Sequence, residues 1–211
     1  MKQEKSQEMA SVPADIGIGL RYAYSCITVR KTLIVYSLFV FFTVPAGYLS
    51  GLLVTRVFGD TYWYLTAVEL AGFGGMMLGG LLMSIWGGFK SRRLTLSAGL
   101  GMFGTMAIGM GVSRHFILYL VFMALYGIAL TTVQTTITTM LQENSEASMQ
   151  GRVFGLMSSL YSSSYPIGMV LFGPLADFIP LQGIMIFSGG ALLLTAGAVY
   201  RHKNLKIGQQ Y

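Results

Sequence analysis

One acidic residue, Glu69, stands well inside a long apolar run, where a charged side chain is costly and is therefore a candidate functional group. It lies about seven residues into the run 62–87, or ~10 Å along a helix that rises about 1.5 Å per residue. A carboxyl group there is suited to carrying a proton or to binding the cationic group of a substrate. The alternative is a carboxyl that only reaches a wet vestibule at the outer end of the helix. No Lys or Arg lies inside any apolar run to pair with it.

A second set of polar residues crowds two neighbouring apolar runs, 116–140 and 153–176, and it has two interpretations. The side chains line a polar cavity, or their hydroxyls bond to carbonyls within and between helices as part of membrane packing. Gln134 is the strongest single candidate for the cavity, because its own helix cannot satisfy every hydrogen-bonding group of the amide. The candidate cavity-lining residues are Pro45, Thr131, Gln134, Thr135, Ser158, Ser162 and Tyr165.

The sequence contains no recognisable set of catalytic or metal-binding residues. His115 and His202 stand at opposite ends of the apolar runs, and the chain has no HExxH, Gly-x-Ser-x-Gly or phosphate-cradling loop. Cys26 is the only cysteine, so neither a disulfide nor a cysteine-based metal site forms within one chain. We therefore expect a protein that is not an enzyme and that holds no cofactor or metal.

Six apolar runs must position these residues, and each is near or above the roughly 20 residues that a helix needs to cross the ~30 Å hydrocarbon layer. The runs cover about 32–54, 62–87, 94–112, 116–140, 153–176 and 181–200. The chain is 54% hydrophobic and only 10% charged, whereas a soluble domain averages about 25% charged residues. The sequence predicts an all-α integral membrane protein, a bundle of six transmembrane helices over 31–200 embedded in a lipid bilayer.

Lysine and arginine divide unequally between the two sides of the predicted membrane. Twelve of the 14 fall on one side, and only Arg56 and Arg114 fall on the other. Because short loops rich in Lys and Arg stay in the cytoplasm, we predict that both termini and the 88–93 and 142–152 loops are cytoplasmic in a multi-pass cell-membrane protein. The net charge of +6 then belongs to the cytoplasmic flanks, and no nucleic-acid partner is expected.

The segments outside the bundle, 1–30 and 201–211, are predicted to be cytoplasmic tails. From Asp15 to Arg30 the apolar residues recur at helical spacing, with polar residues on the other side. Two interpretations remain for this stretch. It is either a basic amphipathic helix that lies in the membrane interface or an ordinary juxtamembrane linker.

Glycine and proline mark where the helices bend and approach one another. Pro45 lies near the middle of the first run and is expected to kink it, because proline removes a backbone donor. Gly75 and Gly79 form a GxxxG pattern, which lets a second helix approach closely. The predicted helix-packing positions are Gly75, Gly79, Gly168, Gly173 and Pro174.

Two stretches resemble the drug exporters of the major facilitator superfamily (MFS). The first comprises QGRVF at 150–154, YPIG at 165–168 and GPLAD at 173–177. It resembles the tenth-to-eleventh helix region of that superfamily, and most of all the group that contains macrolide efflux proteins and the enterobactin exporter. The resemblance extends over nearly the whole chain but matches only the second half of such a transporter.

The second stretch, Gly80 to Arg93, is similar to a degenerate copy of the superfamily's loop signature, Gly-x-x-x-Asp-Arg-x-Gly followed by basic residues. Ser84 and Ile85 stand where the signature has its acid and its arginine, so the charge-relay role proposed for that acid does not carry over. The candidate residues for the cytoplasmic loops and for gating are Gly80, Gly87, Lys90, Arg92, Arg93, Gly151 and Arg152.

The resemblance implies a fold and a function. It makes the six spans the equivalents of helices seven to twelve, so that the first, second, fourth and fifth spans border a central cavity. We expect secondary active transport, with proton-coupled efflux of an amphipathic small molecule by alternating access. The partner would be a second six-helix bundle, either another copy or a separate N-terminal half. The alternative is a truncated or non-transporting fragment, or a membrane interaction module that binds through its glycine-rich faces.

Overall fold

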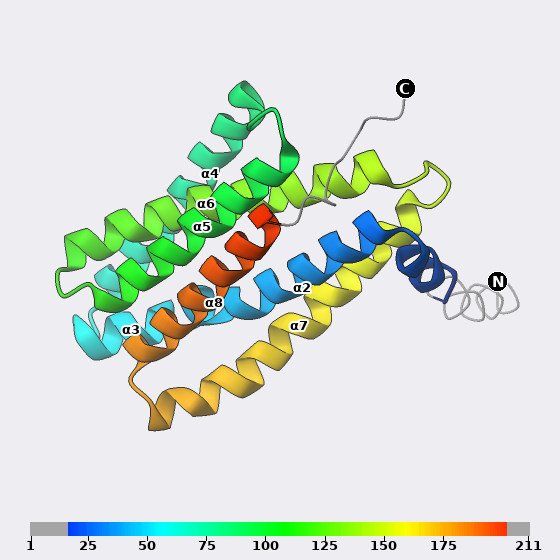
Figure 1. Ribbon diagram of the computed structural model, residues 1–211. Helices are drawn as coiled ribbons and strands as arrows, with labels where there is room; N and C mark the ends of the chain where they lie inside the picture. The colour runs from blue at the N-terminus through cyan, green and yellow to red at the C-terminus, as the bar shows by residue number, and fades with distance from the viewer. Residues whose placement is uncertain (1–16, 202–211) are drawn as a thin grey trace, which may run out of the picture.

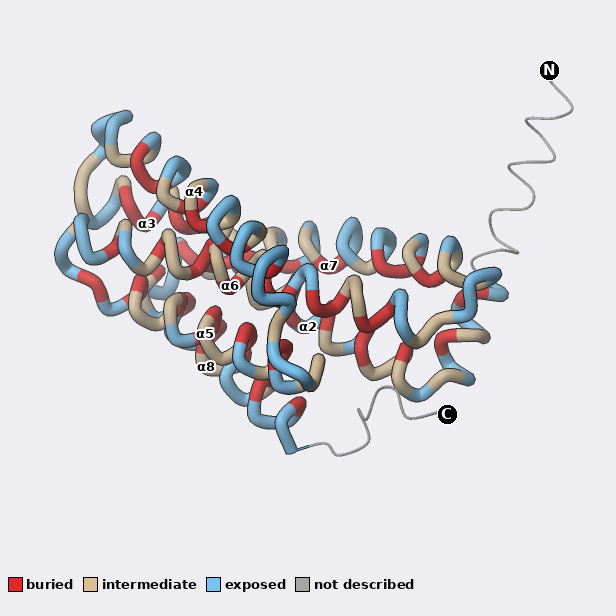
Figure 2. The backbone as a smooth tube through the Cα atoms, turned by 90° about the horizontal axis from the view of Figure 1, so that it is seen from above, coloured by how far each residue is buried: buried red, intermediate tan, exposed pale blue. Residues whose placement is uncertain are grey.

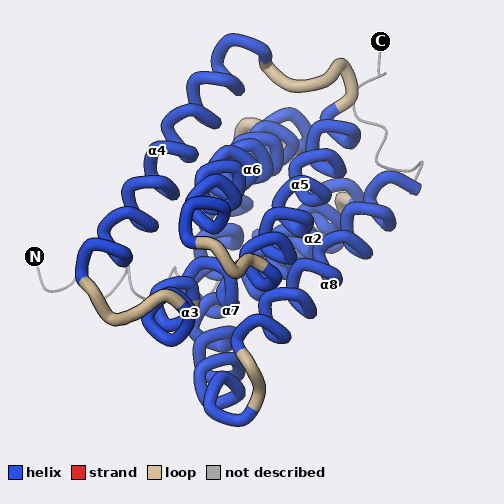
Figure 3. Tube along the Cα trace, turned by 90° about the vertical axis from the view of Figure 1, so that its left-hand side faces the viewer, coloured by secondary structure: helices blue, strands red, loops and turns tan. Residues whose placement is uncertain are grey.

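The computed structural model describes residues 17–201, and these are almost entirely helical (Figure 1). The long helices are α2 (Ile27–Tyr48), α3 (Ser50–Val57), α4 (Tyr62–Trp86), α5 (Arg92–Val112), α6 (Phe116–Asn144), α7 (Gln150–Phe178) and α8 (Leu181–Arg201). Short loops join them, and Figure 3 shows no strand between residues 17 and 201. A further helical stretch, 17–25, precedes α2 and is separated from it at Cys26. The all-α prediction is therefore confirmed. Of the two predicted tails, 1–30 and 201–211, residues 1–16 and 202–211 lie outside the described residues, whereas α2 already begins at Ile27 and α8 ends at Arg201.

The first predicted span is built from two helices, α2 and α3. The helix continues through Pro45, where a kink was expected, and breaks one turn later at Leu49. The Leu49 N–H still reaches the Pro45 carbonyl at 3.2 Å, and the Ser50 hydroxyl donates to the Gly47 carbonyl at 2.7 Å. These bonds satisfy the backbone at the break, as a membrane interior requires. The two helices together form one apolar stretch, Ile27–Val57.

Five helical stretches in the described part of the chain are long and apolar enough to cross a membrane: α2 with α3, α4, α5, α6 and α8. The fifth predicted span, α7, has 29 residues but contains two prolines and a run of serines that lower its hydropathy. The class of membrane helical bundle is thus supported. That α7 is a sixth span, and which way the bundle faces, stay predictions.

Each helix packs mainly on one or two others, in the spatial order α4, α6, α5, α8, α2 and α7. Helix α4 packs on α6, α6 on α5, and α5 on α8, while α2 packs mainly on α7 and α8. Helix α7 makes few contacts with either α6 or α8, so it is attached to the bundle through α2 (Figure 1). Figure 2 shows buried segments along the inner lines of the helices and exposed segments along the outer turns of α4 and α7. One side of the bundle, between α6 and α7, is consequently less filled than the others.

Close packing of small and aromatic residues holds this bundle together. Lipid tails are as apolar as the side chains, so contact between helices has to come from shape complementarity. Phe103 of α5 meets Phe39 of α2 edge to face and Tyr126 of α6 at a tilt, with centroid separations of 5.1 and 4.3 Å. Gly104 of α5 lies against Gly189 of α8, where an added Cβ would come within 2.6 Å of the opposing carbonyl oxygen.

Polar cross-links mark the two ends of the bundle. At one end, Arg92 at the start of α5 pairs with Glu143 near the end of α6, with 3.0 Å between Nη2 and Oε1. At the other end, Arg56 of α3 pairs with Asp177 of α7 at 3.2 Å and donates to the Ala176 carbonyl at 2.7 Å. The end that contains Arg92 also carries most of the described basic residues: Arg21, Arg30, Lys31, Lys90, Arg93, Arg152 and Arg201.

Candidate functional site

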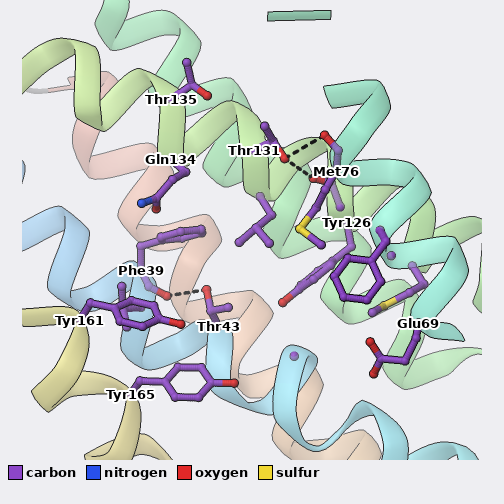
Figure 4. A pocket seen from close by; sticks show the side chains of 17 residues that line it. Phe39, Thr43, Glu69, Met76, Tyr126, Thr131, Gln134, Thr135, Tyr161 and Tyr165 are labelled. Carbon is purple, nitrogen blue, oxygen red and sulfur yellow. Dashed lines mark hydrogen bonds between the residues drawn. The ribbon is translucent and has the colours of Figure 1, made fainter. Parts of the chain in front are cut away.

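A cavity of about 530 Å³ opens on the side of the bundle where α6 and α7 are apart (Figure 4). Its walls come from α2, α4, α6 and α7, the four helices that were expected to border a cavity. Most of the lining is apolar or aromatic, with a few polar groups placed along it, which is the usual make-up of a site for small organic molecules. The polar and aromatic lining residues are Phe39, Thr43, Glu69, Phe73, Tyr126, Thr131, Gln134, Thr135, Tyr161 and Tyr165.

Glu69 is the acidic side chain of this lining. It is exposed at the surface of α4 and makes no ion pair or hydrogen bond with any residue from 17 to 201. Figure 4 shows its carboxylate on the α4 side of the cavity, with Tyr161 and Tyr165 of α7 on the opposite side. A carboxyl group with no partner among the described residues, in an apolar setting, is available to a proton or to a ligand cation.

The α6 wall shows which polar residues serve packing and which face the cavity. The Thr131 hydroxyl lies 3.2 Å from the Gly127 carbonyl of its own helix and 3.3 Å from the Met76 carbonyl of α4, so it also joins the two helices. Thr135 and Gln134 are exposed to the cavity. Both interpretations of these polar residues therefore apply, to different members of the set.

The α7 wall contributes aromatic rings more than hydroxyls. Tyr161 and Tyr165 stack at 5.6 Å between centroids with an interplanar angle of 16°, and both line the cavity. Ser164 is turned away toward α2, where its hydroxyl lies 3.0 Å from that of Ser37. Ser158 and Ser162 are exposed on α7 but do not belong to the lining.

Pro45, which was also a candidate for the lining, is buried within α2 and lies outside it. The first span was also expected to border the cavity. Helix α2 does so through other residues, Phe39, Val40 and Thr43. These positions share one face of the helix with Gly47, where an added Cβ would lie 3.2 Å from the Tyr126 hydroxyl.

Glycines bring the α4 and α6 walls together. A Cβ on Gly79 would come within 2.9 Å of the Ile128 backbone, and one on Gly75 would overlap the Ala124 carbonyl. A Cβ on Gly168 of α7 would likewise come within 2.7 Å of the Val44 Cγ2 on α2. The other two predicted packing positions do not make such contacts in the described structure: Gly173 has open space around it and Pro174 is exposed.

The predicted loop residues lie at or near the basic end of the bundle, but Gly80 falls inside α4 and not in the loop that follows it. Gly87 ends α4 in the left-handed conformation, with φ of +69°, and Arg92 donates to its carbonyl at 2.9 Å. Arg152, at the start of α7, packs against the 17–25 helix, where a Cβ on Gly19 would lie 3.3 Å from the Arg152 Cβ. Gly80 and Gly151 have open space around them, Lys90 is exposed, and Arg93 is half-buried.

Several lining residues were missed by the sequence analysis, chiefly Phe73, Met76, Met123, Tyr126 and Tyr161. A signal for them exists, because Glu69, Phe73 and Met76 recur at the helical spacing of i, i+4 and i+7 on α4. Tyr126, Leu130 and Gln134 recur at i, i+4 and i+8 along α6, again on one face of the helix. Extending each polar candidate along its own helix face would have identified this aromatic and methionine surface.

Comparison with known proteins places the chain near bacterial exporters. No family's sequence profile matches the chain. It is 28% identical over 166 residues to macrolide efflux protein A of Streptococcus pyogenes, covering 78% of this chain and 41% of that protein. It is 29% identical over 139 residues to macrolide efflux protein A of Enterococcus faecalis, which covers 65% of this chain and 43% of the relative.

A third relative extends the comparison beyond macrolide exporters. The multidrug efflux pump Tap of Mycolicibacterium fortuitum is 29% identical over 139 residues, covering 65% of this chain and 33% of that pump. The predicted resemblance to macrolide and multidrug exporters is therefore confirmed. The matched part of the chain spans about two fifths or less of each relative's length.

Proposed function

We propose that this chain forms one half of a secondary efflux transporter for amphipathic small molecules. The observation that carries the proposal is the cavity itself, a mostly apolar and aromatic site with an unpaired carboxyl group, Glu69, on a bundle similar in sequence to named efflux proteins. Aromatic rings suit the apolar part of such a substrate, and the carboxylate suits a cationic group or a proton. A protein of this kind moves its substrate without chemical change, so we infer no enzymatic reaction.

We further propose that a second six-helix bundle completes the site. Alternating access requires two bodies that move about a site between them. Three observations support a missing partner: the cavity is open on one side, Glu69 and Gln134 are exposed there, and the chain matches only part of each relative's length. The partner is either another copy of this chain or an N-terminal half.

The proposed arrangement has α7 as the sixth span and the basic end in the cytoplasm. Helix α7 lies along α2 and ends beside α3 through the Arg56–Asp177 pair, so it extends from one end of the bundle to the other. The positive-inside tendency then supports cytoplasmic termini. A single cysteine at 91, in a Cys26→Ser background, tests this orientation. Labelling of Ser91→Cys by an impermeant reagent from outside intact cells would overturn it.

The proposed function is tested in liposomes that contain the purified chain and an imposed pH gradient. A radiolabelled macrolide is the probe, and photobleaching of a fluorescently labelled chain counts the copies in each vesicle. We expect uptake only in vesicles that hold two copies or that also received the second half. Uptake by vesicles with a single copy would end the two-bundle proposal. No uptake in any of these assemblies would instead favour a non-transporting fragment.

A further inference from the structure

Two apolar grooves run side by side along the outer surface of α2, away from the cavity that contains Glu69. The first, about 540 Å³, lies between α2, the 17–25 helix and α7, and its walls include Leu33, Leu156 and Leu160. The second, about 390 Å³, lies between α2 and α8, and its walls include Val35 and Leu194. Neither groove shares a lining residue with the cavity that contains Glu69.

A single ridge separates the two grooves. Ile34 and Leu38 line both of them and are 54% and 40% exposed, so these side chains stand between the grooves. They are one helical turn apart on α2, which places one above the other along the same face. The result is a pair of apolar channels that run along the helix axis on either side of one ridge.

A cation stands at the same end of each channel. Arg30 belongs to the lining of the first groove and Lys31 to that of the second. On a helix with 3.6 residues per turn, Ile34 lies between these two residues in rotation. The two positive groups therefore flank the top of the ridge, and no acidic side chain belongs to either lining.

Arg30 is held in place by its surroundings, which leave donors free. Its Nη1 lies 3.5 Å from the Tyr24 carbonyl, and its guanidinium carbon lies 5.7 Å from the centroid of the Tyr24 ring. A guanidinium carries five N–H donors in a fixed fork that matches a phosphate. One long backbone contact leaves most of these donors available to a ligand at the mouth of the groove.

From this geometry we propose a binding site for one anionic phospholipid of the surrounding bilayer. The two acyl chains occupy the two grooves on either side of Ile34 and Leu38, and the phosphate-bearing headgroup lies between Arg30 and Lys31. Basic pockets between membrane helices are suited to such headgroups, and apolar channels are suited to the chains. A zwitterionic lipid offers a quaternary ammonium in addition to the phosphate, so the two cations select against it.

The test uses the purified chain in detergent micelles, titrated with phosphatidylglycerol or phosphatidylcholine that carry identical acyl chains. Native mass spectrometry measures the fraction of lipid-bound protein. We expect phosphatidylglycerol to bind more tightly, with each cation contributing about fivefold. Arg30→Gln and Lys31→Gln should each lower that preference about fivefold, whereas Arg30→Lys should retain it. Lys90→Gln removes an exposed charge at the same end of the bundle and should leave it unchanged.

The acyl-chain grooves need a separate test, because a charged patch alone would also prefer an anionic lipid. Ser163→Trp fills the first groove and Ala198→Trp fills the second, and each should weaken binding of both lipids at least fivefold. Val170→Trp adds the same bulk at a position that is 76% exposed and outside both grooves, and it should bind as the wild type does. Circular dichroism verifies the helical content of each variant.

Equal binding of the two lipids to the wild type would overturn the proposal. So would a charge preference that survives in Lys31→Gln and Arg30→Gln, or one that Lys90→Gln reduces equally. Unchanged lipid binding in both groove-filling variants would also overturn it, because the chains would then lie elsewhere. The measurement involves no transport, so either result leaves the proposed efflux function to its own test.

Discussion

Gly75 of α4 lies directly against the Ala124 carbonyl of α6, so closely that a methyl group on Gly75 would overlap the carbonyl oxygen. Gly79 repeats the close approach one turn further along, where an added Cβ would come within 2.9 Å of the Ile128 backbone. Both glycines are buried. The GxxxG pair therefore joins two helices of the same bundle, and these are the helices that carry Glu69 and Gln134 into the cavity.

This contact predicts that Gly75→Val destabilises the bundle. The added side chain cannot be accommodated by a rotamer change, because the opposing atoms belong to the backbone. Overpacking of this kind costs about 1–3 kcal/mol, which for a chain of this size corresponds to a fall of roughly 2–12 °C in Tm. Thermal unfolding of the purified protein in detergent, followed by circular dichroism, measures the shift.

Gly74→Val is the matched control, because a Cβ at Gly74 meets nothing within 4 Å. It carries the same cost of placing a β-branched residue in α4, and its Tm should stay close to that of the wild type. Equal destabilisation by the two substitutions would mean that helix propensity, and not the contact with α6, governs the effect.

The sequence predicted the helices well because apolar length is a local property. The runs at 62–87 and 116–140 correspond to α4 and α6, whose bounds differ from them by only a few residues. The break at Leu49 was not foreseen, since the expected kink was assigned to Pro45 itself. Its position depends on bonds such as that of Ser50 to the Gly47 carbonyl, and the sequence pattern does not reveal them.

The cavity was predicted only in part, for a different reason. Glu69 and Gln134 stand out by residue type, because polar groups are rare in a membrane interior. Serine gives no such signal, because its hydroxyl is satisfied equally by its own helix or by a neighbour. Ser163 bonds to the Ser159 carbonyl at 2.8 Å, and Ser164 reaches Ser37 on α2. Which face of α7 lines the cavity follows from packing on α2, a tertiary relationship.

We predict that the Arg92–Glu143 pair stabilises the basic end of the bundle modestly. Its side chains are about one third exposed, at 34% and 37%, so solvent screens the attraction and a coupling of about 0.2–1 kcal/mol is expected. A double-mutant cycle of Arg92→Ala and Glu143→Ala, measured by thermal unfolding, isolates this coupling. Arg92→Ala alone should cost more, because it also removes the bond to the Gly87 carbonyl. A coupling free energy of zero would show that the two side chains lie close together without stabilising the fold.

We predict that the 17–25 helix stays docked on the start of α7 through Gly19. A Cβ at Gly19 would lie 3.3 Å from the Arg152 Cβ and 3.5 Å from Leu156, so Gly19→Leu should displace the helix. Cys26 reports on this docking, because its half-buried thiol lies 3.9 Å from the Asn144 carbonyl. We expect Gly19→Leu to weaken docking of this helix by about 1.4 kcal/mol, which corresponds to a factor of ten. The rate of thiol labelling at Cys26 should therefore rise about tenfold.

The control is Gly17→Leu, on the same short helix, where an added side chain meets open space. It should label at the wild-type rate. A second variant, Tyr22→Phe, removes the hydroxyl that accepts the Glu146 N–H at 3.1 Å and should raise the rate by a smaller factor. If Gly19→Leu labels no faster than Gly17→Leu, the helix is held by other contacts.

The last prediction concerns Glu69 in the proposed transporter. Glutamine matches glutamate in shape but cannot titrate, so Glu69→Gln should lower pH-driven flux more than tenfold while the protein level stays near normal. Substrate exchange without a pH gradient should persist, since the cavity retains its aromatic walls. Glu69→Asp keeps the carboxyl and should recover part of the driven flux. Driven flux that keeps its full pH dependence in Glu69→Gln would instead assign the carboxyl to a wet vestibule, where it neither carries a proton nor holds a cation.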